Sequence, residues 1–248
     1  MYYRTTMTAN QLNIMGSGVR ASLPFSSPRV LSTKRIGPHN FDVLSIFMGS
    51  LLGDGTMEMD GNGSRFAFYQ EKTHGEYLLW LHKTLFDLGY CKPEIPSIQT
   101  RLSADGINFR YIYRFRTYTY SSFNWIYDYF YIKNGGSHLP STPGANGLRR
   151  KVVPPFISDY LSPLALAVWI MDDGCKIENR GLRFSTNCFT LSEVKFLASI
   201  LSNKYGLVTS IHKTGDINQY NVYVNKSSSE KLAAIVRPLI HPSMLYKI

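Results

Sequence analysis

VLSIFMGSLLGDG, residues 43–55, is the stretch that decides the fold, and LALAVWIMDDG, residues 164–174, is its counterpart later in the chain. Each is an apolar segment of helical length that ends in Asp-Gly. A carboxylate at a helix C-terminus opposes the helix dipole at a cost of roughly 0.3–1 kcal/mol. Two copies of this costly arrangement in one chain predict a molecule of two similar halves, with the acids Asp54 and Asp173 paired at its centre.

The first segment also carries a row of small residues. Ser45, Gly49 and Gly53 are spaced four apart, so they lie on one face of a helix. Glycine inside a helix costs roughly 1 kcal/mol relative to alanine, and close packing against a second helix would compensate. If the second segment packs there, Asp54 and Asp173 emerge side by side. Adjacent carboxylates repel unless protonated or bound to a cation, and with a hard divalent cation they can activate water at a phosphodiester.

Length and composition set the class of protein. The chain has 248 residues, enough for one large domain or two small ones. Lys plus Arg number 27 against 17 Asp plus Glu, and the net charge of +10 suits a polyanion-binding surface. No run of about 18 apolar residues predicts a membrane span. Cys91, Cys175 and Cys188 form no CxxC pair, so we expect three buried free thiols and neither a disulfide framework nor a structural zinc site.

The pattern of apolar and turn residues predicts the same series of elements twice. Asp42 is expected to cap a helix over 43–53, and Ser162, followed by Pro163, is expected to cap the second helix. Further elements of the first half are a strand at 65–71, a helix at 75–88, strands at 97–103 and 109–118 joined by the turn Ala104-Asp105-Gly106, and a helix at 121–132. Those of the second half are a strand at 182–187, a helix at 190–205, strands at 208–213 and 219–225, and a helix at 227–237. With one more strand after each Asp-Gly, this order indicates an α+β fold with two antiparallel sheets.

Four segments are expected along the chain. The halves span 42–132 and 156–248, and the Gly- and Pro-rich residues 133–155 are interpreted as a linker. Residues 1–41 contain no Asp or Glu and include Arg4, Arg20, Arg29, Lys34 and Arg35. Three interpretations of this first segment remain open: an organellar transit peptide, a basic arm along a phosphate backbone, or translated flanking sequence without a role.

The two motifs, FMGSLLGDG at 47–55 and LAVWIMDDG at 166–174, resemble the paired signature helices of a single-chain LAGLIDADG homing endonuclease. The resemblance covers roughly residues 42–248, because the duplicated order of elements matches as well. It implies two pseudo-symmetric αββαββα halves packed through the two motif helices, each half with an antiparallel DNA-binding sheet. The family prefers small residues at the third and seventh motif positions, and the second helix departs from this with Val168 and Asp172.

The resemblance also implies the site residues. Asp54 and Asp173, the last acids of the motifs, would bind catalytic Mg²⁺, for which Mn²⁺ or Ca²⁺ may substitute in binding, and the residues before them, Gly53 and Asp172, are grouped with them in the metal site. Lys151 and Lys247 resemble the basic residues that polarise water or stabilise the phosphate. Gln70 and Asn187, near strand ends in matching places of the two halves, resemble residues that position water. The histidines, including His74, His82 and His138, lack metal-ligand spacing, and we expect structural roles for them.

The predicted strands separate a core face from a polar face. In 109–118, Arg110, Arg114 and Arg116 alternate with aromatic residues that are expected to pack on helices. An antiparallel sheet often has one solvated polar face without any ligand, but together with the charge and the duplicated motif we expect a sheet in the major groove of DNA. The expected DNA contacts are Arg65, Lys72, Arg101, Arg110, Arg114, Arg116, Lys176, Arg183, Ser185, Gln219, Asn221 and Tyr223.

These expectations converge on one function. We predict a monomeric, pseudo-dimeric, metal-dependent endonuclease that cuts both strands of a long pseudo-palindromic DNA site and leaves 3′ overhangs. The resemblance further implies a gene within a mobile intron, in an organelle and more often the mitochondrion than the chloroplast. One alternative is an RNA maturase that binds a group I intron and assists splicing. Another is a DNA-binding regulator, which should lack at least one of the two acids.

Overall fold

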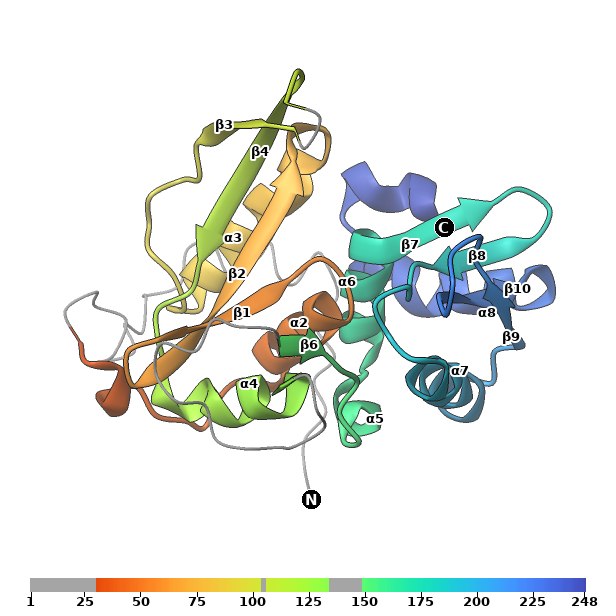
Figure 1. Ribbon diagram of the computed structural model, residues 1–248, viewed down its shortest axis with the longest axis horizontal. Helices are drawn as coiled ribbons and strands as arrows, with labels where there is room; N and C mark the ends of the chain where they lie inside the picture. The colour runs from red at the N-terminus through yellow and green to blue at the C-terminus, as the bar shows by residue number, and fades with distance from the viewer. Residues whose placement is uncertain (1–29, 104–105, 134–148) are drawn as a thin grey trace.

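The structure is a computed structural model that describes residues 30–103, 106–133 and 149–248, and it confirms the α+β fold. Two adjacent helices lie at the centre, with one four-stranded antiparallel sheet on each side of them (Figure 1). The central helices are α2 (Phe41–Leu52) and α6 (Pro163–Asp173). The first sheet has the order β1 (Thr56–Asp60), β2 (Gly63–Glu71), β4 (Phe109–Arg116), β3 (Ile98–Leu102). The second has the order β7 (Gly174–Ile177), β8 (Gly181–Phe184), β10 (Tyr220–Asn225), β9 (Thr209–Lys213).

The remaining helices complete two equivalent halves. In each half a helix links the two hairpins of the sheet and another follows the last strand, which gives the order αββαββα twice. These helices are α3 (Gly75–Asp87) and α4 (Asn124–Phe130) in the first half, and α7 (Leu191–Tyr205) and α8 (Ser229–Val236) in the second. The short helix α5 (Ile157–Tyr160) precedes α6. Among the described residues, no helix has the length and apolar character needed to cross a membrane.

Glycines on α2 allow the two central helices to touch at the backbone. A Cβ on Gly49 would lie 2.3 Å from the carbonyl oxygen of Ala165, and a Cβ on Gly53 would lie 2.5 Å from the Cβ of Asp172. Neither distance is compatible with a side chain at these positions. The predicted small-residue face of α2 is therefore the helix interface, and Gly53 faces the larger residue that occupies the same motif position in α6.

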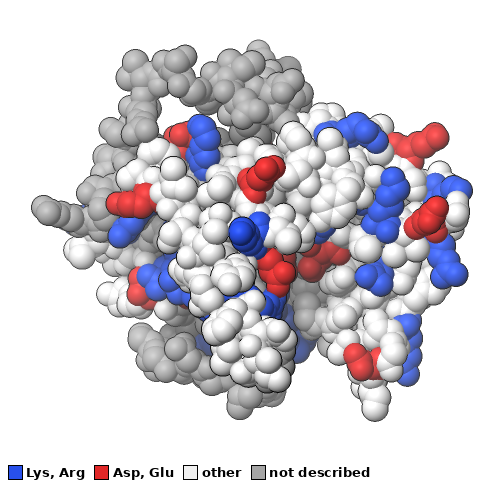
Figure 2. All heavy atoms as spheres, turned by 90° about the horizontal axis from the view of Figure 1, so that it is seen from above, with Lys and Arg blue, Asp and Glu red and all other residues white. Residues whose placement is uncertain are grey.

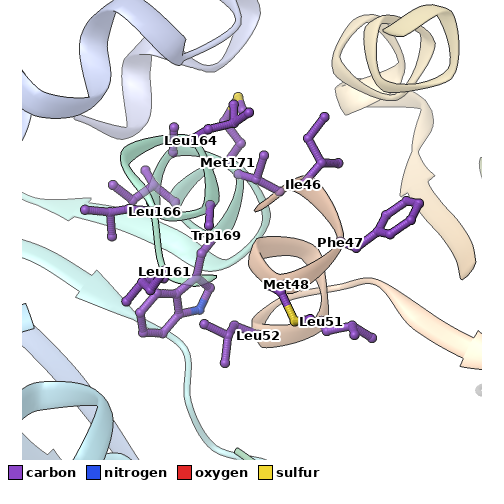
Figure 3. Packing of buried hydrophobic residues seen from close by; sticks show 14 of the residues in the cluster. Ile46, Phe47, Met48, Leu51, Leu52, Leu161, Leu164, Leu166, Trp169 and Met171 are labelled. Atoms are coloured by element: carbon purple, nitrogen blue, oxygen red, sulfur yellow. The ribbon is translucent and has the colours of Figure 1, made fainter. Parts of the chain in front are cut away.

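Aromatic stacking fixes each central helix on its own sheet. Phe47 of α2 stacks on Phe66 of β2 with ring centroids 3.8 Å apart, and Trp169 of α6 stacks on Phe184 of β8 at 4.0 Å. All four side chains are buried in one continuous core, part of which Figure 3 shows around the two helices. Because such interiors are close-packed, the C-terminal ends of both helices are held in place relative to the adjoining strands.

The helix starts agree with the sequence in one half and differ in the other. Ser162 caps α6 as predicted: its Oγ accepts a hydrogen bond from the Ala165 amide at 3.1 Å, with Pro163 at the first helical position. The cap of α2 is Asn40, whose Oδ1 accepts from the amide of Asp42 at 2.7 Å. The prediction that Asp42 is the cap is wrong, because the residue with the extended backbone before the helix lies two positions earlier.

The expected linker, residues 133–155, contains regular structure near its end. Its residues 149–151 form the strand β6 (Arg149–Lys151), which pairs with β5 (Tyr131–Lys133). Residues 134–148 of that linker and 104–105 of the expected hairpin turn lie outside the described residues.

Before the first repeat, Arg35 is buried, donates to the Thr119 carbonyl at 2.9 Å and lies over the ring of Tyr118 at 4.7 Å. This arginine therefore belongs to the packing of the first half and does not form part of a free basic arm.

Two expectations about burial are wrong. Phe109 and Tyr111 of β4 were expected to pack on helices, but their side chains are 61% and 51% exposed. The hairpin of β3 and β4 extends past α3, so no helix covers this end of the sheet (Figure 1). Of the three free cysteines only Cys91 is buried, whereas Cys175 is half-buried and Cys188 is exposed in a turn.

Candidate active site

The two motif acids lie at the ends of the packed helices. Helix α2 ends at Leu52, and Asp54 lies in the turn before β1 with its side chain exposed. Relative to the motif, helix α6 runs two residues further than α2, so that Asp173 is its last residue and is half-buried. Burial and, to a smaller extent, the negative charge of Asp54 raise the pKa of Asp173 to about 7. Because Gly53 lies against Asp172, the two acids emerge at the same end of the helix pair, but they differ in burial.

A lysine holds the backbone beside each acid. The Nζ of Lys151 donates to the carbonyl oxygens of Gly53 at 2.9 Å and Gly55 at 2.8 Å, the residues on either side of Asp54. Burial lowers the pKa of Lys151, although the acids of the site act in the opposite direction. An ammonium group has three donors, so one N–H of Lys151 remains beyond these two bonds to the helix end.

Lys247 occupies the corresponding place in the second half. Its Nζ donates to the carbonyl oxygens of Met171 at 2.5 Å and Asp172 at 2.8 Å, directly before Asp173. Burial lowers its pKa too, against the charges of Asp172, Asp54 and Asp173. A lysine thus binds backbone carbonyls beside each motif acid. Lys247 binds those of the last turn of α6, where the dipole favours a cation, and Lys151 binds those that follow the end of α2.

Gln70 connects the acid of the first half to the helix interface. It lies near the end of β2, is buried, and its Nε2 donates to Asp54 Oδ2 at 2.8 Å and to Asp172 Oδ1 at 3.3 Å. The amide can donate in this way because its Oε1 is held from the other side: it lies 3.2 Å from His74 Nδ1. Since Oε1 only accepts, Nδ1 carries the proton.

The histidine extends this network toward the C-terminus. His74 Nε2 lies 3.0 Å from the hydroxyl of Tyr246, which therefore donates to it. The chain of hydrogen bonds runs from Tyr246 through His74 and Gln70 to Asp54, and so links the last residues of the second half to the acid of the first. The sequence suggested only a structural role for His74, because nothing in its spacing indicates that it orients Gln70.

Asp172 is enclosed by donors from the protein. Its Oδ2 accepts from Ser50 Oγ at 3.0 Å, and its Oδ1 accepts from the Tyr77 hydroxyl at 2.9 Å. Burial and then the charges of Asp54 and Asp173 raise its pKa well above the usual range. The carboxyl is 8% exposed. These contacts describe a hydrogen-bonded acid at the helix interface, so we do not include Asp172 among the metal ligands proposed below.

Asn187 does not match Gln70 in the strand register. Gly174 pairs with Phe184, and Thr56 pairs with Ala67 one step beyond Gly55. Phe68 and Phe184 are thus equivalent, and the residue equivalent to Gln70 is Thr186. Asn187 is exposed in the turn that follows. The prediction that Gln70 and Asn187 occupy matching places is wrong, because the first hairpin is longer and the sequence alone does not give its register.

The outer face of the first sheet carries the arginines that were expected to contact DNA. Two glutamates, which were not among the predicted site residues, form ion pairs with these arginines. Arg65, Arg114 and Arg116 all form ion pairs with Glu58, and Arg110 pairs with Glu71. Arg101, opposite Arg110 in the β3–β4 register, and Lys72, after β2, are exposed. Figure 2 likewise shows basic and acidic side chains next to one another on the face that it draws.

The second sheet presents a sparser face. Arg183 and Tyr223 are cross-strand partners on its outer side, and Arg183 Nε has no hydrogen-bond partner among the described residues. Ser185 and Gln219 are half-buried at the ends of β8 and β10. Asn221 is buried, and its Oδ1 accepts the Thr186 amide at 3.1 Å.

Lys176 lies on the opposite face. It pairs with the core residue Leu182, and its Nζ donates to the Ile248 carbonyl at 2.8 Å. Lys176 was expected among the DNA contacts together with Arg183, but the two side chains point to opposite sides of the sheet, because Lys176 lies across from Leu182 and not from Arg183.

A model of the LAGLIDADG DNA endonuclease family matches residues 44–232, a span that includes both motif helices and both sheets. The chain belongs to this family.

Its relatives include proteins named as maturases and proteins named as intron-encoded endonucleases. This LAGLIDADG protein is 46% identical over 216 residues to the cytochrome b mRNA maturase bI2 of Saccharomyces cerevisiae. The matched region covers 86% of this chain and 48% of the maturase. The protein is 37% identical over 164 residues to the intron-encoded endonuclease ai4 of Dictyostelium discoideum, covering 64% of this chain and 92% of that protein. The chain therefore spans about half the length of the yeast maturase.

A solved structure shows the same fold. The homing endonuclease I-WcaI, bound to its DNA recognition sequence, superimposes with a TM-score of 0.69 at 22% identity, covering 95% of this chain and 96% of that one. The departure of the second LAGLIDADG motif from small residues is explained by the packing described above. Gly53 provides room for Asp172, and Gly49 comes closest to the backbone of Ala165.

The second LAGLIDADG sheet also carries a hollow that was not predicted from the sequence. It has a volume of about 370 Å³ and polar or basic side chains line it. His212 stands edge-on to Tyr223 with ring centroids 4.7 Å apart and lies 2.9 Å from Ser210 Oγ. Ser210 and His212 are two residues apart in the predicted strand 208–213 and therefore lie on the same face of it. This spacing was the sequence signal for a polar surface here. The lining residues are Asn179, Arg180, Ser210, His212, Tyr223, Asn225 and Lys226.

Proposed function

We propose that this chain is a site-specific endonuclease that cuts both strands of a long DNA site. The observation that carries the proposal is the pair of intact acids, Asp54 and Asp173, at the ends of two packed helices. A lysine binds the backbone beside each acid. Two copies of one hydrolytic arrangement, related by the pseudo-two-fold axis, suit the two antiparallel strands of a duplex.

The acids fit a hard divalent cation. Carboxylate oxygens are ligands that Mg²⁺ prefers. Burial and, after it, the negative charge of Asp54 raise the pKa of Asp173, and a bound cation would offset both by stabilising the ionised carboxylate. Within residues 30–103, 106–133 and 149–248 no group of three His, Cys, Asp or Glu residues is placed to hold an ion. Each aspartate would therefore hold a cation together with phosphate oxygens and water, which keeps coordination positions open for the substrate. When bound, the cation would activate water and stabilise the charge on the phosphate.

The residues around the acids act by positioning. Lys151 and Lys247 hold the backbone on which each acid stands, and each retains a donor for a phosphate oxygen. Gln70 fixes one oxygen of Asp54 through a hydrogen bond of 2.8 Å, which leaves the other oxygen for the cation. Gln70 is the one residue of the predicted water-positioning pair that reaches an acid of the site.

The finer features of the activity belong to this proposal as well. We infer Mg²⁺ as the working ion, a single chain acting as a pseudo-dimer, cleavage that leaves 3′ overhangs, and the outer faces of both sheets as the DNA-reading surface. Relatives named as intron-encoded endonucleases support a gene within an intron, and we place the protein in an organelle, the mitochondrion in preference to the chloroplast.

A cleavage assay tests the proposal. The full-length chain is incubated with Mg²⁺ and a plasmid that carries the joined exons of the intronless host gene. Linearisation at one position, abolished by EDTA and by the double change Asp54→Asn, Asp173→Asn, is the expected result. Absence of any cut in the wild type, with Mn²⁺ as well as Mg²⁺, would overturn the endonuclease proposal.

A second candidate function is that of an RNA maturase, which the 46% identity to the yeast cytochrome b mRNA maturase favours. The intact acids do not argue against it, since one surface could bind intron RNA and another cut DNA. The test is binding to the host intron RNA by the Asp54→Asn, Asp173→Asn variant. Nanomolar binding and stimulated splicing without the acids would establish the maturase, and equal affinity for an unrelated RNA of the same length would exclude it.

A further inference from the structure

Three arginines of the first sheet converge on one carboxylate. Glu58, on the edge strand β1, accepts from Arg114 at 2.6 Å and from Arg116 at 2.8 Å, and the Nε of Arg65 lies 3.3 Å away. The three arginines come from the two neighbouring strands β2 and β4. All four side chains lie on the outer face of the sheet, the face proposed to read DNA.

The cluster is anchored and remains charged. Arg65 also pairs with Asp60 at 2.9 Å, and Asp60 in turn accepts from Thr119 Oγ1 at 2.6 Å. Partial burial raises the pKa of Glu58, but the hydrogen bonds and charges of the arginines outweigh it, so the net pKa is lowered. At neutral pH the carboxylate is therefore ionised and holds the guanidinium groups in a fixed array.

Stability alone does not account for this cluster. The four side chains of the Glu58 pairs are 23–39% exposed, and ion pairs with such access to water contribute only about 0–1 kcal/mol each. The second half has no counterpart: by register from the Gly174–Phe184 pair, the residue equivalent to Glu58 is Ile177. Among the described residues, this cluster of one acid and three arginines is therefore specific to the first sheet and contributes little to stability.

We propose that Glu58 determines specificity in the first half of the DNA site, an inference that rests on the proposed DNA-binding function. A duplex of any sequence offers phosphates, which must compete with Glu58 for three arginines and which its charge repels. A cognate duplex offers two further groups in the major groove. The N4 amine of cytosine can donate a hydrogen bond to the glutamate, and O6 and N7 of guanine can accept hydrogen bonds from an arginine. Glu58 thus weakens binding to a duplex that offers only phosphates. Binding is restored only where G·C pairs beneath the cluster form hydrogen bonds with both Glu58 and the arginines.

The experiment compares the wild type with Glu58→Gln, both as the full chain. Each protein selects from a library of random-sequence duplexes in Ca²⁺, and its affinity for the unselected library is measured over a salt series. We expect the wild type to enrich a site with one or more fixed G·C pairs in one half. Glu58→Gln should lose that preference, keep the preferences in the other half, and bind the unselected library at least about threefold more tightly. Its plot of log K against log salt should steepen by about 1 or more, since each phosphate contact contributes roughly 0.9.

Glu71→Gln is the matched control, because Glu71 lies on the same face but pairs with Arg110 alone, and both of these side chains are about half exposed. It should leave the G·C preference unchanged. If Glu58→Gln fails to fold, as judged by its Tm, Glu58→Asp replaces it: the charge is kept, so the salt dependence should match the wild type while the G·C preference weakens.

Each outcome decides one of the two proposals. Unchanged enrichment by Glu58→Gln, or equal effects of Glu58→Gln and Glu71→Gln, would overturn the role of Glu58 and leave the DNA-binding proposal intact. Weaker binding by Glu58→Gln to every sequence would also overturn it, because the carboxylate would then only brace the sheet. If the wild type enriches no sequence at all, the proposed site-specific function itself fails.

Discussion

The two halves share one fold but differ where the chemistry lies. In the first half the acid Asp54 is exposed in a turn and is held by Gln70, whereas in the second half Asp173 ends the helix, is half-buried and has a raised pKa. The sheets also differ: three arginines of the first sheet are bound to Glu58, whereas Nε of Arg183 on the second has no hydrogen-bond partner among the described residues. Duplication thus preserved the backbone and the paired lysines, while the environment of each acid diverged.

The largest effect is expected from removing each acid in turn. Asp54→Asn and Asp173→Asn should each slow cleavage of one strand by more than about 100-fold, because loss even of groups that only support a metal ligand costs about 10–100-fold. The product would be nicked DNA, with a different strand cut in each variant. Gels of strand-labelled duplex measure this, and loss of both cuts in either variant would show that the two acids serve one shared site.

The role of Gln70 separates the halves further. Gln70→Ala should slow the strand that Asp54→Asn identifies by about 10–100-fold, since it removes the donor that fixes that carboxylate. The equivalent residue, Thr186, donates from its Oγ1 to the Tyr220 carbonyl at 2.8 Å, and among the described residues it makes no hydrogen bond to the Asp173 carboxylate. Thr186→Val is therefore the control and should leave both strand rates unchanged. Equal slowing of both strands by Gln70→Ala would contradict the division.

The helix interface is asymmetric in volume. Gly49→Ala should destabilise the fold by about 2 kcal/mol, since its Cβ would meet the Ala165 carbonyl at 2.3 Å and overpacking typically costs 1–3 kcal/mol. At the same motif position of the second helix, Val168 is fully buried, and Val168→Ala should cost about 1–2 kcal/mol at roughly 0.8 kcal/mol per buried carbon. Urea unfolding measures both changes. A Gly49→Ala variant as stable as the wild type would show that the helices are further apart than described.

The smallest effect is a dependence on pH in the second half. The pKa of Asp173 is raised to about 7, so below this pH a proton occupies the carboxylate and competes with a cation. At a subsaturating cation concentration, cleavage of the strand assigned to Asp173 should fall about tenfold from pH 8 to pH 6, since cation binding releases that proton. Higher Mg²⁺ should restore the rate at pH 6. A loss that no cation concentration restores would place the titration in another group.

Much of the site was visible in the sequence. Asp54, Asp173, Lys151 and Lys247 were all selected there, and the structure brings all four to the ends of the two helices. Gln70 was identified as well, but its supposed partner Asn187 was not at the equivalent position. The difference lies in distance along the chain: a motif within one helix has fixed geometry, whereas the match between two hairpins of different length depends on a register that only strand pairing defines.

The sequence by itself determined the duplicated α+β order, the small-residue face of the first helix and the acids at both helix ends. These follow from local periodicity and from glycine spacing, which act within a few residues. Only the tertiary structure decided how side chains are arranged: that Lys176 and Arg183 point to opposite sides of the second sheet, that His74 orients Gln70, and that Glu58 binds three arginines from two other strands. Each of these depends on contacts between segments far apart in the chain, for which no single stretch of sequence carries the signal.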